Sequence, residues 1–210
     1  MQYLLNNFDV VATRFGEHLR LTSIALLIAL LIALPLGVLI NRIKWLESPV
    51  MSVLNVLYTI PSLALLVLLV PFLGLGATTA IVVLVIYAQV ILVRNIVVGL
   101  NGVNPDIVEA ARGMGMNGWQ RFIRVEVPLA LPVMIAGIRI ATVTIIGIAT
   151  VAALINAGGL GRILFEGVSR RSPDRIIAGA LAAAALAALA NGLLRLLEWR
   201  ATVAVRGDEA

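Results

Sequence analysis

Residues 99–128 read GLNGVNPDIVEAARGMGMNGWQRFIRVEVP and form a polar segment in the middle of a mostly apolar chain. This segment carries charges of both signs, whereas the neighbouring stretches 78–93 and 140–155 carry none. Long apolar runs that alternate with short charged connections are typical of a protein that crosses a membrane several times. The segment 99–128 is therefore predicted to connect two membrane-spanning helices.

Working outward from this segment, the chain offers room for five membrane-spanning helices. Four stretches lack charge altogether, namely those between Arg20 and Arg42, Glu47 and Arg94, Arg139 and Arg162, and Arg175 and Arg195. A helix needs about 20 apolar residues to cross the hydrocarbon core, so the longest stretch holds two helices, divided at the glycine-rich turn 74–76. The predicted spans are 21–40, 50–73, 78–98, 131–155 and 176–197. Strands of a barrel would be only about 10 residues long and would alternate in polarity, so the predicted fold class is an all-α membrane protein.

Composition supports one transmembrane domain over residues 1–210. The chain is 61% hydrophobic and 13% charged, and its mean hydropathy is +1.05, whereas soluble domains are about half apolar and one-quarter charged. Without cysteine there is no disulfide, thiolate nucleophile or thiolate metal site. The net charge of +5 indicates basic cytoplasmic flanks and a lipid bilayer as the surroundings, with no nucleic-acid partner.

The basic residues also predict the orientation in the membrane. With the amino terminus outside and the carboxyl terminus in the cytoplasm, ten Lys and Arg residues lie inside and six outside, as counted from the sequence. The positive-inside tendency favours this arrangement. The connection 156–175 does not follow this tendency, because four arginines in it would lie outside.

Within the polar segment, local signals predict two short helices joined by a glycine-rich turn. Asn104 is a candidate N-cap, and Pro105 suits the first helical turn because its missing amide hydrogen is not needed there. The first short helix is expected to run through Ala111, and the second from Trp119 to Val127. Such a pair could rest on the membrane surface or present a compact apolar knob to a partner.

The spacing in this segment distinguishes these two possibilities. Glu109, Ala110 and Ala111 are followed after three residues by Gly115, and nine residues later by Val125, one residue, Val127 and Pro128. This pattern resembles the EAA signature of ATP-binding-cassette importer permeases, with valine in place of the signature's isoleucine and leucine. The resemblance implies the type I, MetI-like importer fold, with 99–128 as the coupling loop that docks into a cytoplasmic ATPase.

Three further stretches resemble the glycine betaine, carnitine and choline permeases of osmoprotectant importers. They are YTIPSLALLVLLVPFLGLG at 58–76, PLALPVMIAGIR at 128–139 and NAGGLGRILFEG at 156–167. The resemblance implies a bacterial cytoplasmic membrane protein that works with two ATPase subunits, a second permease copy or paralogue, and an external substrate-binding protein. The expected cargo is a small compatible solute, with methionine or another small substrate as the alternative.

Polar side chains within the spans are expected to face other helices or an aqueous path, because lipid solvates them poorly. Tyr58, Thr59 and Gln89 are the candidate pathway residues, and Pro61 places its span at the pathway or at a subunit contact because it removes a backbone donor. Hydrogen bonding between helices is the alternative role. The only histidine, His18, is expected to be an interfacial polar residue.

The sequence offers no catalytic or metal site. It has no GxxxxGK[ST] phosphate loop, so ATP and its magnesium are expected on partner subunits, and no cofactor is expected in this chain. The GxGxxG pattern at 113–118 lacks the strand that a dinucleotide site needs. A stand-alone channel or an intramembrane enzyme would be the functions of a different class, and neither requires a coupling loop.

Overall fold

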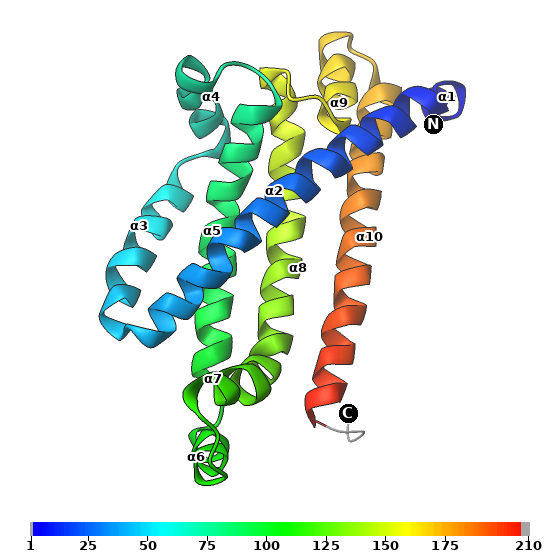
Figure 1. Cartoon of the computed structure of the whole chain (residues 1–210). Helices are drawn as coiled ribbons and strands as arrows, with labels where there is room; N and C mark the ends of the chain where they lie inside the picture. Colours follow the sequence, from blue (N-terminus) through cyan, green and yellow to red (C-terminus); the bar gives the residue numbers. More distant parts are fainter. Residues whose placement is uncertain (1, 207–210) are drawn as a thin grey trace.

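The computed structural model describes residues 2–206, which are almost entirely helical (Figure 1). The helices are α1 (Gln2–Asn6), α2 (Phe8–Arg42), α3 (Glu47–Thr59), α4 (Ser62–Leu73), α5 (Ala77–Asn101), α6 (Pro105–Gly113), α7 (Gly118–Arg121), α8 (Val127–Val151), α9 (Leu160–Ser169) and α10 (Pro173–Arg206). Short 3₁₀ turns at Lys44–Leu46 and Ala152–Ile155 and a π-helical turn at Phe122–Glu126 join some of them. The described residues contain no strand, as the lengths of the apolar stretches predict.

Four helical stretches are long and apolar enough to cross a membrane: Phe8–Arg42, Ala77–Asn101, Gly118–Ile155 and Pro173–Val205. The pair α3 and α4 would provide a fifth crossing as a broken span. The amino terminus lies at one end of the bundle, whereas the carboxyl-terminal part of α10 lies at the other, together with α6 and α7 (Figure 1).

The predicted span 50–73 is not a single helix. The helix ends at Thr59 and restarts at Ser62, and the two halves are bent by 95°. Ile60 adopts an extended conformation (φ −66°, ψ 128°), as the steric demand of the following Pro61 favours. The carbonyl oxygen of Ile60 accepts a hydrogen bond from the Tyr87 hydroxyl, so the bend is anchored to α5.

The polar segment also ends earlier than residue 128, and the last helix ends later than residue 197. The predicted second short helix is the first part of a continuous helical stretch, Gly118–Ile155, that passes through the π-helical turn. Pro128 lies inside this stretch, directly after the π-helical turn, where the backbone already departs from the regular α-helical hydrogen-bond pattern. Helix α10 continues to Arg206.

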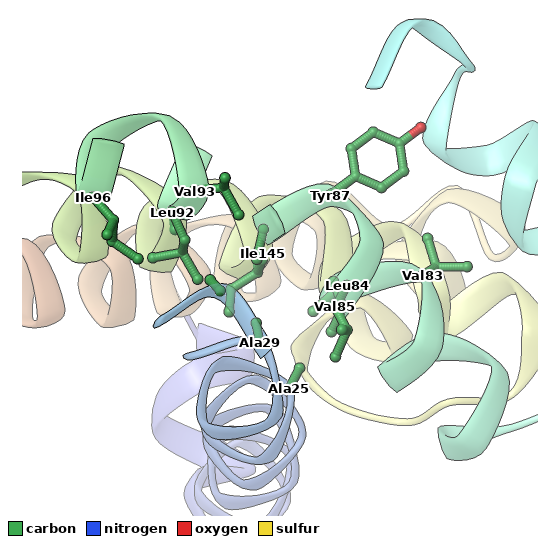
Figure 2. Packing of buried hydrophobic residues seen from close by; sticks show 14 of the residues in the cluster. Ala25, Ala29, Val83, Leu84, Val85, Tyr87, Leu92, Val93, Ile96 and Ile145 are labelled. Carbon is green, nitrogen blue, oxygen red and sulfur yellow. The ribbon is translucent and has the colours of Figure 1, made fainter. Parts of the chain in front are cut away.

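The core forms where α2 and α8 pack against α5. Ala25, Ala29 and Ala33 of α2 are fully buried and recur every four residues, which places them on one helical face. Figure 2 shows Ala25 and Ala29 among the side chains of α5 and α8. At Gly37 of the same face, an added Cβ would lie 2.5 Å from Ile96. Small residues thus allow the close helix approach that stabilises membrane bundles.

The alanine-rich helix α10 packs within the subunit, against α8 and α9. Ala178 and Ala182 are buried, and Ala182 shares a cluster with Ile146 of α8 and Ile163 of α9. Further along the helix, Leu189 and Leu193 are exposed, which suits contact with lipid. Internal packing therefore accounts for part of the alanine pattern.

Candidate functional site: the helical loop at one end of the bundle

Helix α6 begins with the local signals that the sequence predicts. The side chain of Asn104 accepts a hydrogen bond from the amide of Asp106 at 2.8 Å, and Pro105 occupies the first turn. Together they satisfy the orphan backbone donors of a helix start. Asp106 adds a carboxylate in the first turn, where the helix dipole favours it.

The turn after α6 depends on one glycine. Gly115 has φ +82°, a conformation that residues other than glycine rarely adopt. Its amide donates to the carbonyl of Arg112 at 3.0 Å, and the next amide, of Met116, donates to Ala111 at 3.2 Å. These bonds satisfy carbonyl groups at the end of α6 and reverse the chain.

Helix α7 starts with a complete capping box. The Asn117 side chain accepts from the Gln120 amide at 2.9 Å, and the Gln120 side chain accepts from the Asn117 amide at 3.0 Å. This arrangement occupies two donors reciprocally. The turn between α6 and α7 is thus defined by hydrogen bonds on both sides.

Four residues of the EAA pattern lie in the projecting loop, and three lie in the helix that continues into the bundle. In the loop, Glu109, Ala110 and Gly115 are exposed, whereas Ala111 is buried. The three residues of the helix, Val125, Val127 and Pro128, are half-buried. The pattern therefore joins a projecting surface to a membrane-spanning helix.

The projecting surface is apolar as well as polar. Ile107, Met114 and Trp119 are 44%, 71% and 69% exposed. Ile107 belongs to α6, Met114 follows it and Trp119 belongs to α7. Helix α6 extends beyond the end of α5, and α7 lies beside that end (Figure 1). We call the exposed surface of residues 105–119 the coupling knob. Large apolar side chains gathered on an exposed polar rim are typical of a protein-binding surface.

At the base of this knob, one contact reaches α2 and two others lie within residues 119–126. The guanidinium of Arg42 lies 5.1 Å from the centre of the Phe122 ring, and the Trp119 ring lies 6.2 Å from the same ring. Arg121 forms an ion pair with Glu126 at 3.1 Å. Since Phe122 is buried, it links the knob to the end of α2.

The candidate pathway residues fall into two separate places. Tyr58, Thr59 and Pro61 are exposed at the bend between α3 and α4, and the Tyr58 ring lies 5.6 Å from that of Tyr87. Gln89, in contrast, is buried between helices, and its side-chain amide donates to the carbonyl of Ala29 at 3.1 Å. Gln89 therefore joins α5 to α2, and the structure does not bring it together with the other three.

A polar stripe lies on α3, and the sequence reasoning singled out only Asn55 of it, as a polar residue expected to face other helices or an aqueous path. Ser48, Ser52 and Asn55 are exposed and recur at intervals of four and three residues, so they share a helical face. Arg94 of α5 donates to the Asn55 side chain at 2.8 Å. These side chains line an open groove of about 700 Å³. The helical spacing of the three polar residues is the signal that could have revealed it.

His18 is not an interfacial residue. It is fully buried; its Nε2 lies 3.1 Å from the carbonyl oxygen of Ile146, and its Nδ1 accepts from the Leu160 amide at 3.3 Å. A carbonyl can only accept and an amide can only donate, so the ring carries its proton on Nε2. His18 therefore binds the backbone of two distant segments.

A membrane bundle with a helical loop of this kind at one end is typical of the permease subunit of an ATP-binding-cassette importer. The chain belongs to the family of binding-protein-dependent transport system inner membrane components, whose family model matches residues 21–203. It is thus a multi-pass inner-membrane protein.

Curated relatives match over nearly the whole chain. The glycine betaine/carnitine/choline transport system permease protein OpuCB of Bacillus subtilis is 39% identical over 202 residues, which cover 96% of this chain and 93% of the relative. The osmoprotectant import permease protein OsmW of Salmonella typhimurium is 41% identical over 203 residues, with 94% of each chain covered.

Solved structures show the same fold. An inward-facing MetNI methionine ABC transporter matches with a TM-score of 0.80 at 24% identity, covering 89% of this chain and 93% of that chain. An amino acid ABC transporter with histidines matches with a TM-score of 0.79 at 22% identity, covering 95% and 97%. At this identity the likeness shows the MetI-like fold alone.

Proposed function

We propose that this permease subunit translocates a small compatible solute of the glycine betaine, choline or carnitine class. The observation that carries the proposal is the match to osmoprotectant permeases at 39% and 41% identity over almost the full length of both chains. The methionine alternative has only structural likenesses at 24% identity or less behind it. An external binding protein selects and delivers the solute.

In this proposal the coupling knob docks on a cytoplasmic ATPase, and one such ATPase sits under each of two permease subunits. The exposed Glu109, Ala110 and Gly115 contact the ATPase surface, while Val125, Val127 and Pro128 pass its motion into α8. Support comes from the geometry: the knob is exposed, and its root continues without a break into a membrane-spanning helix. ATP and magnesium stay on the ATPase.

The translocation path runs beside α3, between this subunit and a second permease copy or paralogue. Helix α3 has no buried residue in the single chain, so one side of it is open to a partner. Its polar stripe and Arg94 provide hydrogen-bonding groups where a membrane protein otherwise faces lipid. Tyr58 and Thr59 lie at the far end of the same helix and Pro61 lies just after it, and in this proposal all three also line the path.

The proposed orientation has the amino terminus outside and the knob in the cytoplasm. The knob and the end of α10 lie at one end of the bundle, and α9 lies at the other (Figure 1). Labelling single cysteines at Asn117 and Ser169 in this cysteine-free chain tests it. An impermeant reagent on intact cells should label position 169 and spare position 117, and the reverse pattern would refute the orientation.

The substrate class is tested by competition. The permease is reconstituted in liposomes with its ATPase and binding protein, and uptake of radiolabelled glycine betaine is measured with excess unlabelled choline, carnitine or methionine. We expect quaternary ammonium compounds to compete and methionine to have no effect. Uptake of methionine without uptake of any quaternary ammonium compound would overturn the proposed substrate.

A further inference from the structure

Helix α9 presents a polar face at the end of the bundle opposite the coupling knob (Figure 1). Leu160, Ile163 and Gly167 are buried against the bundle, whereas Arg162 and Arg170 are exposed. The helix is therefore amphipathic, and its outward face carries the charges.

The start of α9 is held in place by two neighbouring residues of α2. The Glu17 carboxylate accepts from the Gly159 amide at 2.9 Å, and His18 accepts from the amide of Leu160. Gly158 and Gly159 have φ of +83° and +75°, and a Cβ on either would lie within 3 Å of Glu17 or His18. The polar face of α9 thus has a fixed position relative to α2.

The far end of α9 is fixed by close packing against α10. A Cβ on Gly167 would lie 2.8 Å from the amide nitrogen of Ile176, and a Cβ on Gly179 would lie 2.9 Å from the amide nitrogen of Leu164. Such close backbone approach leaves little room for the helix to shift. Both ends of α9 are therefore rigidly attached to membrane-spanning helices.

Four arginines lie on and after α9, and two of them have internal partners. Arg162 pairs with Glu166 at 3.1 Å. Arg175 lies 3.7 Å from the same carboxylate and 4.8 Å from the centre of the Tyr3 ring. Residues 160–175 contain these four arginines but only two acidic residues, Glu166 and Asp174, so positive charge is in excess. Asp174 has contacts of its own.

The remaining two arginines, Arg170 and Arg171, are exposed. Neither side chain forms a hydrogen bond or an ion pair with another residue of the described part of the chain. Beside them, a hollow of about 250 Å³ is lined by Asn156, Arg162 and Arg170, among others. Basic residues on an outer connection oppose the positive-inside tendency, so these arginines need a reason other than membrane insertion.

We propose that Arg162, Arg170 and Arg171 form a docking surface for an acidic patch of the external substrate-binding protein. This inference rests on the proposed orientation, which places α9 outside, where a binding protein must approach. A surface held at both ends suits a protein partner of fixed shape, because no ordering is needed on contact. Lipid headgroups are mobile and would not require a surface that is held in a fixed position. Through Glu17 and His18, docking at α9 also reaches α2 and the core.

The test is a titration of ATPase activity with the transporter's own binding protein. The double variant Arg170→Glu/Arg171→Glu and the wild type are reconstituted with the ATPase in phosphatidylcholine liposomes. The concentration of binding protein for half-maximal stimulation should rise on the order of tenfold in the variant, because attraction at exposed charges becomes repulsion. The maximal rate should stay the same, and added salt should weaken the wild type more than the variant.

Two controls separate this proposal from its alternatives. Arg200→Glu, an exposed reversal on the part of α10 at the opposite end of the bundle, should leave the titration unchanged. Identical titrations for the wild type and the double variant would overturn the docking surface. A difference that appears only in liposomes with anionic lipids would also overturn it, because the arginines would then bind lipid. Failure of the wild type itself to show stimulation would instead count against the proposed function.

Discussion

Gly115 offers the sharpest test of the coupling knob, because its backbone conformation disfavours a side chain although its surroundings have room for one. Its φ of +82° disfavours any side chain, yet nothing lies within 4 Å of the place where a Cβ would be. Gly115→Ala therefore adds no clash and only forces an unfavourable backbone conformation. That conformation costs an L-residue about 1–2 kcal/mol.

A matched control lies two residues away. Gly113 also has open space around an added Cβ, but it belongs to α6 and its φ is not positive. Gly113→Ala should stabilise the helix by about 0.5–1 kcal/mol, since alanine has the higher helix propensity. The two variants thus carry the same side chain and differ in backbone strain alone.

The strain at Gly115 should lower the population of the docking-competent turn. At 1.4 kcal/mol per factor of ten, a strain of 1–2 kcal/mol lowers the ratio of the docking-competent turn to rearranged turns by roughly 5- to 30-fold. We expect Gly115→Ala to reduce co-purification with the ATPase and substrate-stimulated ATP hydrolysis, and Gly115→Asp to reduce them further through its charge. Gly115→Asn should be milder, because asparagine tolerates positive φ.

The assay reads co-purification, ATP hydrolysis and uptake on the same preparations, with membrane insertion as the check on folding. Gly113→Ala should match the wild type in all of them. Equal activity of correctly inserted Gly115→Ala and Gly113→Ala would refute the role of this turn in coupling. Normal uptake after deletion of residues 109–118 would refute it for the whole knob.

Three further predictions concern packing and can be measured as thermal unfolding in detergent. His18→Leu should lower the free energy of unfolding by about 1–3 kcal/mol for each backbone group left unpaired. His18→Asn should restore part of this loss. Equal stability of the two variants would count against the hydrogen bonds of His18. Gly161→Ala should block folding, because its Cβ would lie within 3 Å of the backbone of α8, while Gly147→Ala, with open space around its Cβ, should fold normally. Tyr87→Phe should cost about 0.5–1.5 kcal/mol and increase proteolytic cleavage at the bend between α3 and α4, and unchanged cleavage would show that the bend does not depend on this hydroxyl.

Much of the fold could be predicted because lipid imposes a strong pattern on the sequence. The apolar stretches were long enough to identify the membrane-spanning helices, and local chemistry at Asn104 and Pro105 was enough to place the start of α6. The Glu109–Gly115 spacing pointed to the importer permease family, which the family model confirms, whereas its role in coupling stays a prediction. Each of these signals is contained in one continuous stretch of the chain, so it can be recognised from the sequence.

The features that were missed depend on contacts between distant residues. Hydropathy alone does not reveal the bend at Ile60, although an extended residue before Pro61 is a known tendency; its anchor, Tyr87, is 27 residues away. His18 finds a partner 128 residues along the chain. A lone histidine beside a membrane span gives no hint of such a contact.

The most direct measurement of the central claim is the dependence of solute uptake on ATP. Liposomes containing the permease and its ATPase start without glycine betaine inside, and uptake of external radiolabelled glycine betaine is followed with the binding protein outside and ATP on the side of the ATPase. The account predicts accumulation above the external concentration only when both are present, and none with a non-hydrolysable ATP analogue. Equilibration of glycine betaine without ATP or ATPase would contradict it and identify the chain as a channel.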